Sequence, residues 1–193
     1  MSPISNKLLK EDTEALLPHE DDLLKLIGDE VNLSRVAYNE IYRFTLLYSL
    51  AEAKIVGMNE GMGNTRNVVM RLESVGALDH DLVEKVFTHF RNRYVTDDGH
   101  INARFSRYLL PQNSPVGAQA RTTFEALLVN SGPDFIERAS CVFKVMFRLR
   151  NNLFHGAKWA YNLSDQEVNF YLSSQLLRAC LERTKGITWQ LHS

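Results

Sequence analysis

The residues from Phe143 to Gly156, FKVMFRLRNNLFHG, interleave apolar and reactive polar side chains closely. The apolar members are Phe143, Val145, Met146, Phe147, Leu149, Leu153 and Phe154. The polar members are Arg148, Arg150, Asn151, Asn152 and His155. Burial of the first group would bring the second to the edge of a core, where partial desolvation strengthens interactions between charges. This stretch is therefore the first candidate for a functional site.

Helical geometry limits which of these side chains can act together. At about 100° per residue, Arg148, Asn151, Asn152 and His155 share one face, with the spacing i, i+3, i+4, i+7. Arg150 lies about 140° from His155 on an unbroken helix. Arg150 and His155 therefore meet only if the backbone departs from a regular helix, or if a second copy of the chain supplies one of them. Gly156 is expected to end the helix.

Composition restricts the class of protein. The chain has 193 residues, of which 45% are hydrophobic, as is usual for one globular domain. No apolar run approaches the roughly 18 residues that cross a bilayer, so no membrane partner is expected. The polar, acidic N-terminus lacks the apolar core of a signal peptide, which predicts a cytoplasmic protein. A net charge of −1 excludes a general basic field for nucleic acid, so any polyanion must bind a local basic site.

Cysteine usage gives no sign of a metal site. Cys141 and Cys180 are the two cysteines, and apolar neighbours surround both, which predicts buried free thiols. No Cys/His spacing resembles a zinc site. Neither a metal nor a cofactor is expected.

Helical segments separated by short polar breaks predict an all-α helical bundle with one core. Residues 1–30 are expected to form an acidic extension with an amphipathic helix at 7–17, and residues 31–193 to form the helical domain. The predicted helices of that domain are 35–56, 66–75, 79–94, 101–110, 116–129, 135–155 and 165–185. No stretch has convincing strand alternation, and no internal repeat is present.

Three further features lie outside the segment 143–156. The Gly-rich stretch Met58–Thr65 lacks the lysine and preceding strand of a phosphate loop, and is expected to be a flexible connector. Glu52, on the predicted helix 35–56, is expected to be a surface carboxylate. The alternative is that it pairs with an arginine of the segment 143–156. His89, Arg91 and Arg93 end a predicted helix, where cations suit the helix dipole or could contact an RNA backbone.

The segment RNNLFH, from Arg150 to His155, resembles the motif of the HEPN superfamily. That motif is an arginine, often followed by a polar residue, and then a histidine after four to six residues. The earlier helix YRFTLLYSLAEAKIVG, at 42–57, is similar to the early helix of such domains, and the compatible layout covers about 34–185. The resemblance implies a bundle that forms a homodimer, with the two motifs facing each other across the interface. Ala157 stands where one group of the family carries a tyrosine that a partner enzyme modifies, so this control is not expected.

Many members of the superfamily are metal-independent endoribonucleases, often toxins or antiviral effectors, and the resemblance assigns catalysis to Arg150, Asn151 and His155. RNA supplies its own 2′-hydroxyl nucleophile. An imidazole ordinarily titrates near neutral pH, so the residue type of His155 suits proton transfer, and Arg150 suits bidentate contact with a phosphate. Asn151 would orient His155 or donate to the phosphate, while Arg148 and Lys158 would widen a basic rim for the substrate. A two-fold dimer would place two such sets in one cleft.

The leading expectation is a HEPN-type ribonuclease that acts as a homodimer on RNA, with an antitoxin or regulatory protein as a further partner. The alternative is a non-catalytic helical module that binds RNA, a nucleotide or a protein partner through the same face. A third reading is a structural subunit whose polar motif fixes a dimer interface. The near-zero net charge favours the binding module and the structural subunit, because nonspecific RNA binding usually needs a basic surface. The concentration of polar residues at one helix end favours the ribonuclease.

Overall fold

The computed structural model describes residues 35–110, 117–154, 166–187 and 189. Regular structure in this part of the chain is helical, apart from one isolated bridge between Val95 and Ile101. The α-helices are α3 (Arg35–Lys54), α4 (Thr65–Ser74), α5 (His80–Tyr94), α6 (Ala118–Val129), α7 (Phe135–Phe154) and α9 (Glu167–Arg183). Shorter elements are the 3₁₀ turns η1 (Met58–Glu60) and η2 (Met62–Asn64) and the π-helical turn η3 (Phe105–Leu109). The predicted all-α fold is confirmed, while the predicted extension at 1–30 lies outside the described residues.

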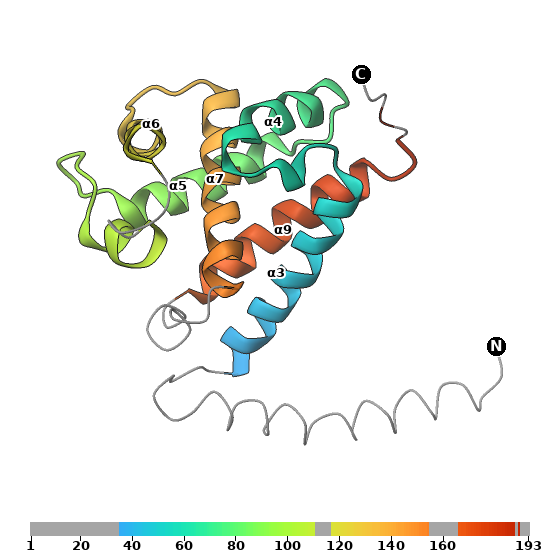
Figure 1. Cartoon of the computed structure of the whole chain (residues 1–193), viewed down its shortest axis with the longest axis horizontal. Coiled ribbons are helices and arrows are strands. Elements are labelled where there is room, and N and C mark those ends of the chain that lie inside the picture. Colours follow the sequence, from blue (N-terminus) through green and yellow to red (C-terminus); the bar gives the residue numbers. More distant parts are fainter. Residues whose placement is uncertain (1–34, 111–116, 155–165, 188, 190–193) are drawn as a thin grey trace.

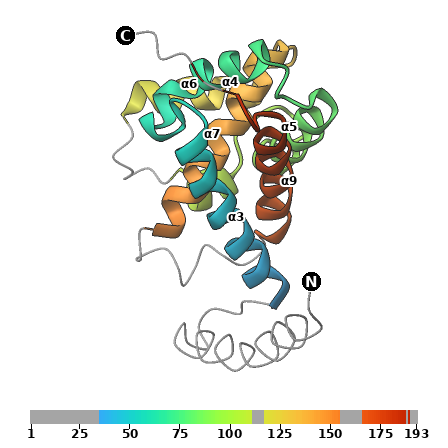
Figure 2. The same cartoon turned by 90° about the vertical axis from the view of Figure 1, so that its right-hand side faces the viewer.

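Helix α7 is the centre of the bundle (Figures 1 and 2). It packs against α4, α5, α6, η2 and η3. Its middle is buried on nearly every side, through Ala139, Ser140, Cys141, Val142, Phe143, Val145 and Met146. A helix that is apolar almost all round belongs in a core. The segment 143–154 is therefore held rigidly by its surroundings until the last turn reaches the edge of the bundle.

The start of α7 is set by a reciprocal cap. The Glu137 backbone N–H donates to Asp134 Oδ1 at 2.7 Å, and the Asp134 backbone N–H donates to Glu137 Oε2 at 3.0 Å. This capping box satisfies two N–H groups that the helix itself cannot pair. The cap fixes where α7 begins, and the 20-residue helix then carries the motif about 30 Å to the opposite end.

Helix α3 packs lengthwise on α9 to form the other side of the bundle (Figures 1 and 2). Its buried side chains are Ala37, Ile41, Phe44, Tyr48 and Ala51. The ring of Phe44 lies 5.3 Å from that of Phe170 on α9, centroid to centroid. Val36, by contrast, is 65% exposed. Because Ala37 and Ile41 face the core, the side chain of Val36, about 100° around the helix from Ala37, faces outward.

The Gly-rich stretch after α3 is packed against the core. Gly57 has φ +85°, a left-handed conformation that glycine adopts without strain. Lys144 on α7 donates from Nζ to the carbonyl of Met62 at 2.9 Å. The predicted connector is thus two short turns, η1 and η2, tied to α7.

Two expectations from composition can be compared with the described part of the chain. Cys141 and Cys180 are free and buried, as predicted. None of the helices described has the length and apolarity needed to cross a bilayer.

Candidate active site at the end of α7

Arg150, on the last turn of α7, forms an ion pair with Glu52 on α3. Arg150 Nη2 lies 3.1 Å from Glu52 Oε2, and the side chains are 33% and 20% exposed. The prediction of a surface carboxylate at Glu52 was wrong, and the alternative, a pair with a motif arginine, is the arrangement found. A partly buried pair is screened less than one in open solvent, so each charge holds the other in place.

Two further contacts orient the Arg150 guanidinium. Nη1 donates to Asn151 Oδ1 at 3.1 Å, and the guanidinium carbon lies 5.0 Å from the centroid of the Phe154 ring, one helical turn on. Such a cation–π contact fixes the plane of the guanidinium group over the ring. Two of its five N–H groups have hydrogen-bond partners among the described residues, so donors remain for an anion. Phe154 is 57% exposed, which places this end of α7 at the protein surface.

Tyr48 lies one turn before Glu52 on α3 and forms the buried floor of the site. It is 1% exposed. Burial, and then the Glu52 carboxylate, raise the pKa of Tyr48 well above its usual range, and Arg150 lowers it only in part. The phenol therefore stays neutral beside the ion pair. The sequence analysis did not single out Tyr48, although its i, i+4 spacing to Glu52 is a signal that both face the same way.

Arg148 and Asn152 face the interior, away from the Arg150 side of α7. Arg148 Nε donates to the carbonyl of Leu109 at 3.4 Å, and Arg148 Nη2 donates to Asn152 Oδ1 at 3.3 Å. Asn152 Nδ2 donates to the carbonyls of Tyr108 and Leu109 at 2.8 and 3.2 Å. These hydrogen bonds satisfy the backbone carbonyls of Tyr108 and Leu109, the last two residues of the π-helical turn η3.

This arrangement differs from the expected basic rim. Arg148 was predicted to bind substrate at the surface, but only 6% of the side chain is exposed, and burial lowers the pKa of its guanidinium. The physical reason is that positions 148 and 152, four apart, lie on the side of α7 that packs on η3. The shared polar face expected for 148, 151, 152 and 155 is therefore divided, because Asn151 accepts a hydrogen bond from Arg150 instead. His155 and Lys158 lie outside the described residues.

A second polar cluster joins α5 to α9. His89 Nε2 lies 2.7 Å from Asn169 Oδ1, and Asn169 Nδ2 donates to the Tyr94 hydroxyl at 3.2 Å and to Gln166 Oε1. Because both amide hydrogens of Asn169 are used, its oxygen is the acceptor and His89 Nε2 is the donor. Burial lowers the pKa of His89, and the Arg93 charge lowers it further, against the effect of the Asn169 bond. The contacts of His89 thus connect two helices, and they do not point to RNA.

No group of three or more His, Cys, Asp or Glu side chains that could hold a metal ion is present within the described ranges. Comparisons of the chain with protein-family models, with curated proteins and with solved structures find no match. None of these comparisons therefore assigns the chain to a family.

Proposed function

We propose that the chain is a metal-independent endoribonuclease of HEPN type, whose site combines Arg150, Asn151 and His155 from two copies of the chain. The observation that supports this best is the guanidinium of Arg150. Glu52, Asn151 and Phe154 hold it at the accessible end of α7, five residues before a histidine. A cation whose orientation is set before substrate binds stabilises developing negative charge at little reorganisation cost.

The proposed reaction uses the RNA 2′-hydroxyl as nucleophile. His155 accepts the 2′-hydroxyl proton, the 2′-oxygen bonds to the adjacent phosphorus, and the bond to the 5′-oxygen breaks. The 5′-oxygen leaves with a proton from the second histidine of the dimer. Arg150 donates to the non-bridging oxygens as they gain charge, and the Asn151 amide N–H groups donate beside it. The products are a 2′,3′-cyclic phosphate and a 5′-hydroxyl.

Glu52 acts in this proposal as a positioning residue for Arg150. Its carboxylate also offsets the positive charge of the guanidinium, so a phosphate would be held mainly by directed hydrogen bonds. This agrees with the net charge of −1, which offers no general attraction for RNA. Because Arg148 is turned inward, the proposed basic rim consists of Arg150 and Lys158.

A second candidate function is a non-catalytic module that binds RNA, a nucleotide or a protein partner through the same surface. Two observations favour it: Glu52 already neutralises Arg150, and the large ring of Phe154 is 57% exposed beside it. An exposed aromatic ring next to an arginine is a common centre of protein interfaces. A role as a toxin or defence effector, with an antitoxin or regulatory partner, rests on the HEPN resemblance alone.

The deciding experiment is cleavage of labelled RNA by the purified full-length protein in EDTA. We expect cyclic-phosphate products from the wild type and a loss of about 100-fold or more in His155→Ala and Arg150→Ala. Arg178→Ala is the matched control. Arg178 also pairs with a glutamate, Glu182 one turn along α9, but its side chain is exposed. Light scattering reports the oligomeric state of each protein.

Each other outcome selects against the proposal. Cleavage that persists in both variants, or that EDTA abolishes, contradicts it. Binding of RNA without cleavage, lost in Arg150→Ala, supports the binding module. A strict monomer contradicts the shared site.

A further inference from the structure

The hydroxyl of Tyr48 is the polar end of a side chain that is otherwise packed into the core beneath the Arg150 site. Tyr48 and Glu52, four residues apart, share the inward face of α3. The ring of Phe44 packs against that of Tyr48, with 5.6 Å between the two centroids, and this contact holds the phenol in place. A tyrosine buried in this way usually has a hydrogen-bond partner for its hydroxyl.

That partner is missing from the part of the chain that the structure describes. The Tyr48 hydroxyl makes no hydrogen bond there, and its oxygen is not among the unpaired polar atoms that the fold seals from solvent. The small exposed part of this side chain therefore lies at the hydroxyl. A rigid ring that ends in an open, unpaired hydroxyl is suited to donating a hydrogen bond to a bound ligand.

The charges near this hydroxyl indicate which ligand it would meet. Glu52 raises the pKa of Tyr48 and Arg150 lowers it, so both members of the ion pair lie near the phenol oxygen. Because burial keeps the pKa well above its usual range, the phenol retains its proton and remains a donor. Arg150 has further N–H donors beyond those bonded to Glu52 and Asn151. A guanidinium and a neutral O–H group together suit the oxygens of a phosphate.

We propose that the Tyr48 hydroxyl donates a hydrogen bond to a non-bridging oxygen of the RNA phosphate that Arg150 holds. This inference rests on the proposed function, because it assigns one more substrate contact to the same site. Glu52 offsets the charge of Arg150, so directed hydrogen bonds must supply much of the attraction for the phosphate. The hydroxyl adds such a bond without adding charge, and Tyr48 is thus a substrate-binding residue.

Tyr48→Phe removes the hydroxyl and keeps the ring, so it tests the contact without opening a cavity. We expect RNA cleavage in EDTA, per folded molecule, to fall about 10-fold, the effect of one lost hydrogen bond. Affinity for a labelled RNA whose 2′-hydroxyls are all methylated, which cannot be cleaved, should fall by a similar factor in fluorescence anisotropy. The urea midpoint should not change, because no hydrogen bond within the described residues is lost.

Tyr94→Phe is the matched control. Tyr94 is equally buried, but its hydroxyl already accepts a hydrogen bond from Asn169 Nδ2 at 3.2 Å. Removing that hydroxyl leaves a buried amide N–H without its acceptor. Tyr94→Phe should therefore lower the urea midpoint, and it should leave the RNA affinity and the rate per folded molecule unchanged.

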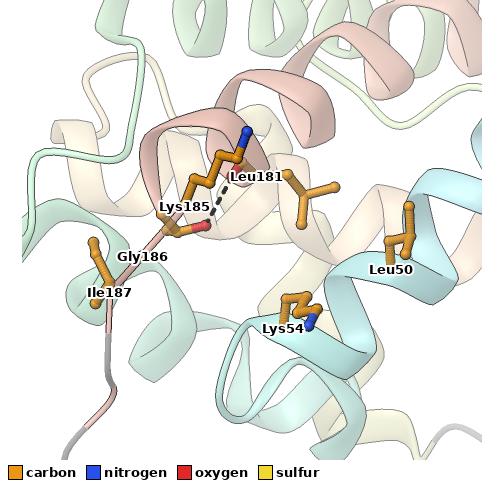
Figure 3. A pocket seen from close by; sticks show the side chains of 7 residues that line it. Leu50, Lys54, Leu181, Lys185, Gly186 and Ile187 are labelled. Atoms are coloured by element: carbon orange, nitrogen blue, oxygen red, sulfur yellow. Dashed lines mark hydrogen bonds between the residues drawn. The ribbon is translucent and has the colours of Figure 1, made fainter.

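A lysine in a separate groove controls for general attraction by positive charge. Figure 3 shows this groove between the C-terminal ends of α3 and α9, with Lys185 on the α9 side. The α3 residues that line it, Leu50 and Lys54, are about 200° around the helix from Glu52. Lys185→Ala should leave the RNA affinity unchanged.

A double variant locates the contact. If both donors hold one phosphate, Tyr48→Phe should weaken binding of the methylated RNA much less in the Arg150→Ala protein than in the wild type. Equal losses in the two backgrounds would place the effect of Tyr48 away from Arg150 and overturn the proposal.

The outcomes separate this contact from the proposed ribonuclease. If the wild type cleaves RNA and Tyr48→Phe keeps its rate and affinity, the Tyr48 contact is overturned and the ribonuclease stands. If the wild type binds RNA without cleaving it, and Tyr48→Phe still weakens binding, the contact stands and cleavage is contradicted. A wild type that neither binds nor cleaves RNA overturns both. A fall in the urea midpoint as large as that of Tyr94→Phe would show that the Tyr48 hydroxyl has a partner inside the protein, which also overturns the contact.

Discussion

The carboxylate of Glu52 lies 3.1 Å from the guanidinium of Arg150, although 98 positions separate the two residues in the chain. This contact joins the end of α3 to the end of α7. It also divides the polar motif into two parts with different surroundings. Arg150 and Asn151 lie at the accessible edge, whereas Arg148 and Asn152 are bound inside the protein. Substitutions in the two parts should therefore have different effects.

The first prediction concerns the energy of the Glu52–Arg150 pair. A double-mutant cycle with Glu52→Gln and Arg150→Met should give a coupling of about 1 kcal/mol, because both side chains are largely shielded from solvent. The Arg178–Glu182 pair, 66% and 62% exposed, is the control and should give a smaller coupling, because solvent screens it. Urea unfolding of the single and double variants measures both values. Equal couplings for the two pairs would show that burial adds nothing at Glu52.

The second prediction separates charge from geometry at Arg150. Arg150→Lys keeps the positive charge but loses the planar fork, so RNA cleavage should fall by about 100-fold. Initial rates in EDTA, corrected for folded protein, measure the loss. Arg148→Lys is the control, and it should lower stability while leaving the rate per folded molecule nearly unchanged. A normal rate in Arg150→Lys would mean that the phosphate needs only a nearby charge.

The third prediction compares the two neighbouring asparagines of the motif. Asn152→Ala should lower the free energy of unfolding by about 2 kcal/mol, because it removes the donor to Tyr108 and Leu109 and an acceptor of Arg148. Asn151→Ala should cost less than about 0.5 kcal/mol, since its side chain is only half-buried and its one hydrogen bond within the described residues is that with Arg150. Chemical denaturation of both variants gives the comparison. A larger loss in Asn151→Ala would reverse the assignment of inner and outer faces.

The fourth prediction concerns the turn after α3. Gly57→Ala should destabilise the protein by about 2 kcal/mol, because φ is +85° and an added Cβ would lie 2.6 Å from Asn64 Nδ2 and 2.7 Å from Arg71 Nη1. Gly63→Ala, in the same stretch, has open space around its Cβ and should be neutral or slightly stabilising. Thermal unfolding of the two variants tests this contrast. Similar melting temperatures would argue against the packed turns.

The fifth prediction is a pH dependence from His89. Burial lowers the pKa of His89 in the folded protein below the value of about 6.5 expected for the unfolded chain. Between these two values the unfolded chain binds more protons, so stability rises with pH. The contribution is complete above about pH 6.5 and is lost as the pH falls through the lower folded value.

His89→Gln should flatten this slope, since glutamine can still donate to Asn169 but does not titrate. Unfolding free energies between pH 8 and pH 5 measure it, a range above the ordinary carboxyl pKa values. His80→Gln is the control, because His80 is 60% exposed beside Glu73. The hypothesis fails if both variants keep the wild-type slope.

Local sequence was sufficient for the described α-helices to within two residues at each end, whereas the helix predicted at 101–110 is only the π-helical turn η3. Asp79 accepts from the backbone N–H of Leu82, and Asp134 and Glu137 cap α7 reciprocally, each across a spacing of three residues. Burial of Ile41, Phe44 and Tyr48 followed from helical periodicity. These features depend on residues within one or two turns of each other, so the order of the amino acids contains them directly.

Only the tertiary structure decided which side of each polar segment reaches the protein surface. Glu52 pairs with a residue 98 positions away, and Arg148 binds a carbonyl 39 positions away. Periodicity places a side chain on one face of its own helix but does not say which helix lies opposite. That choice depends on how all the apolar faces pack together at once, because the crossing of α3, α7 and η3 is set by the whole core.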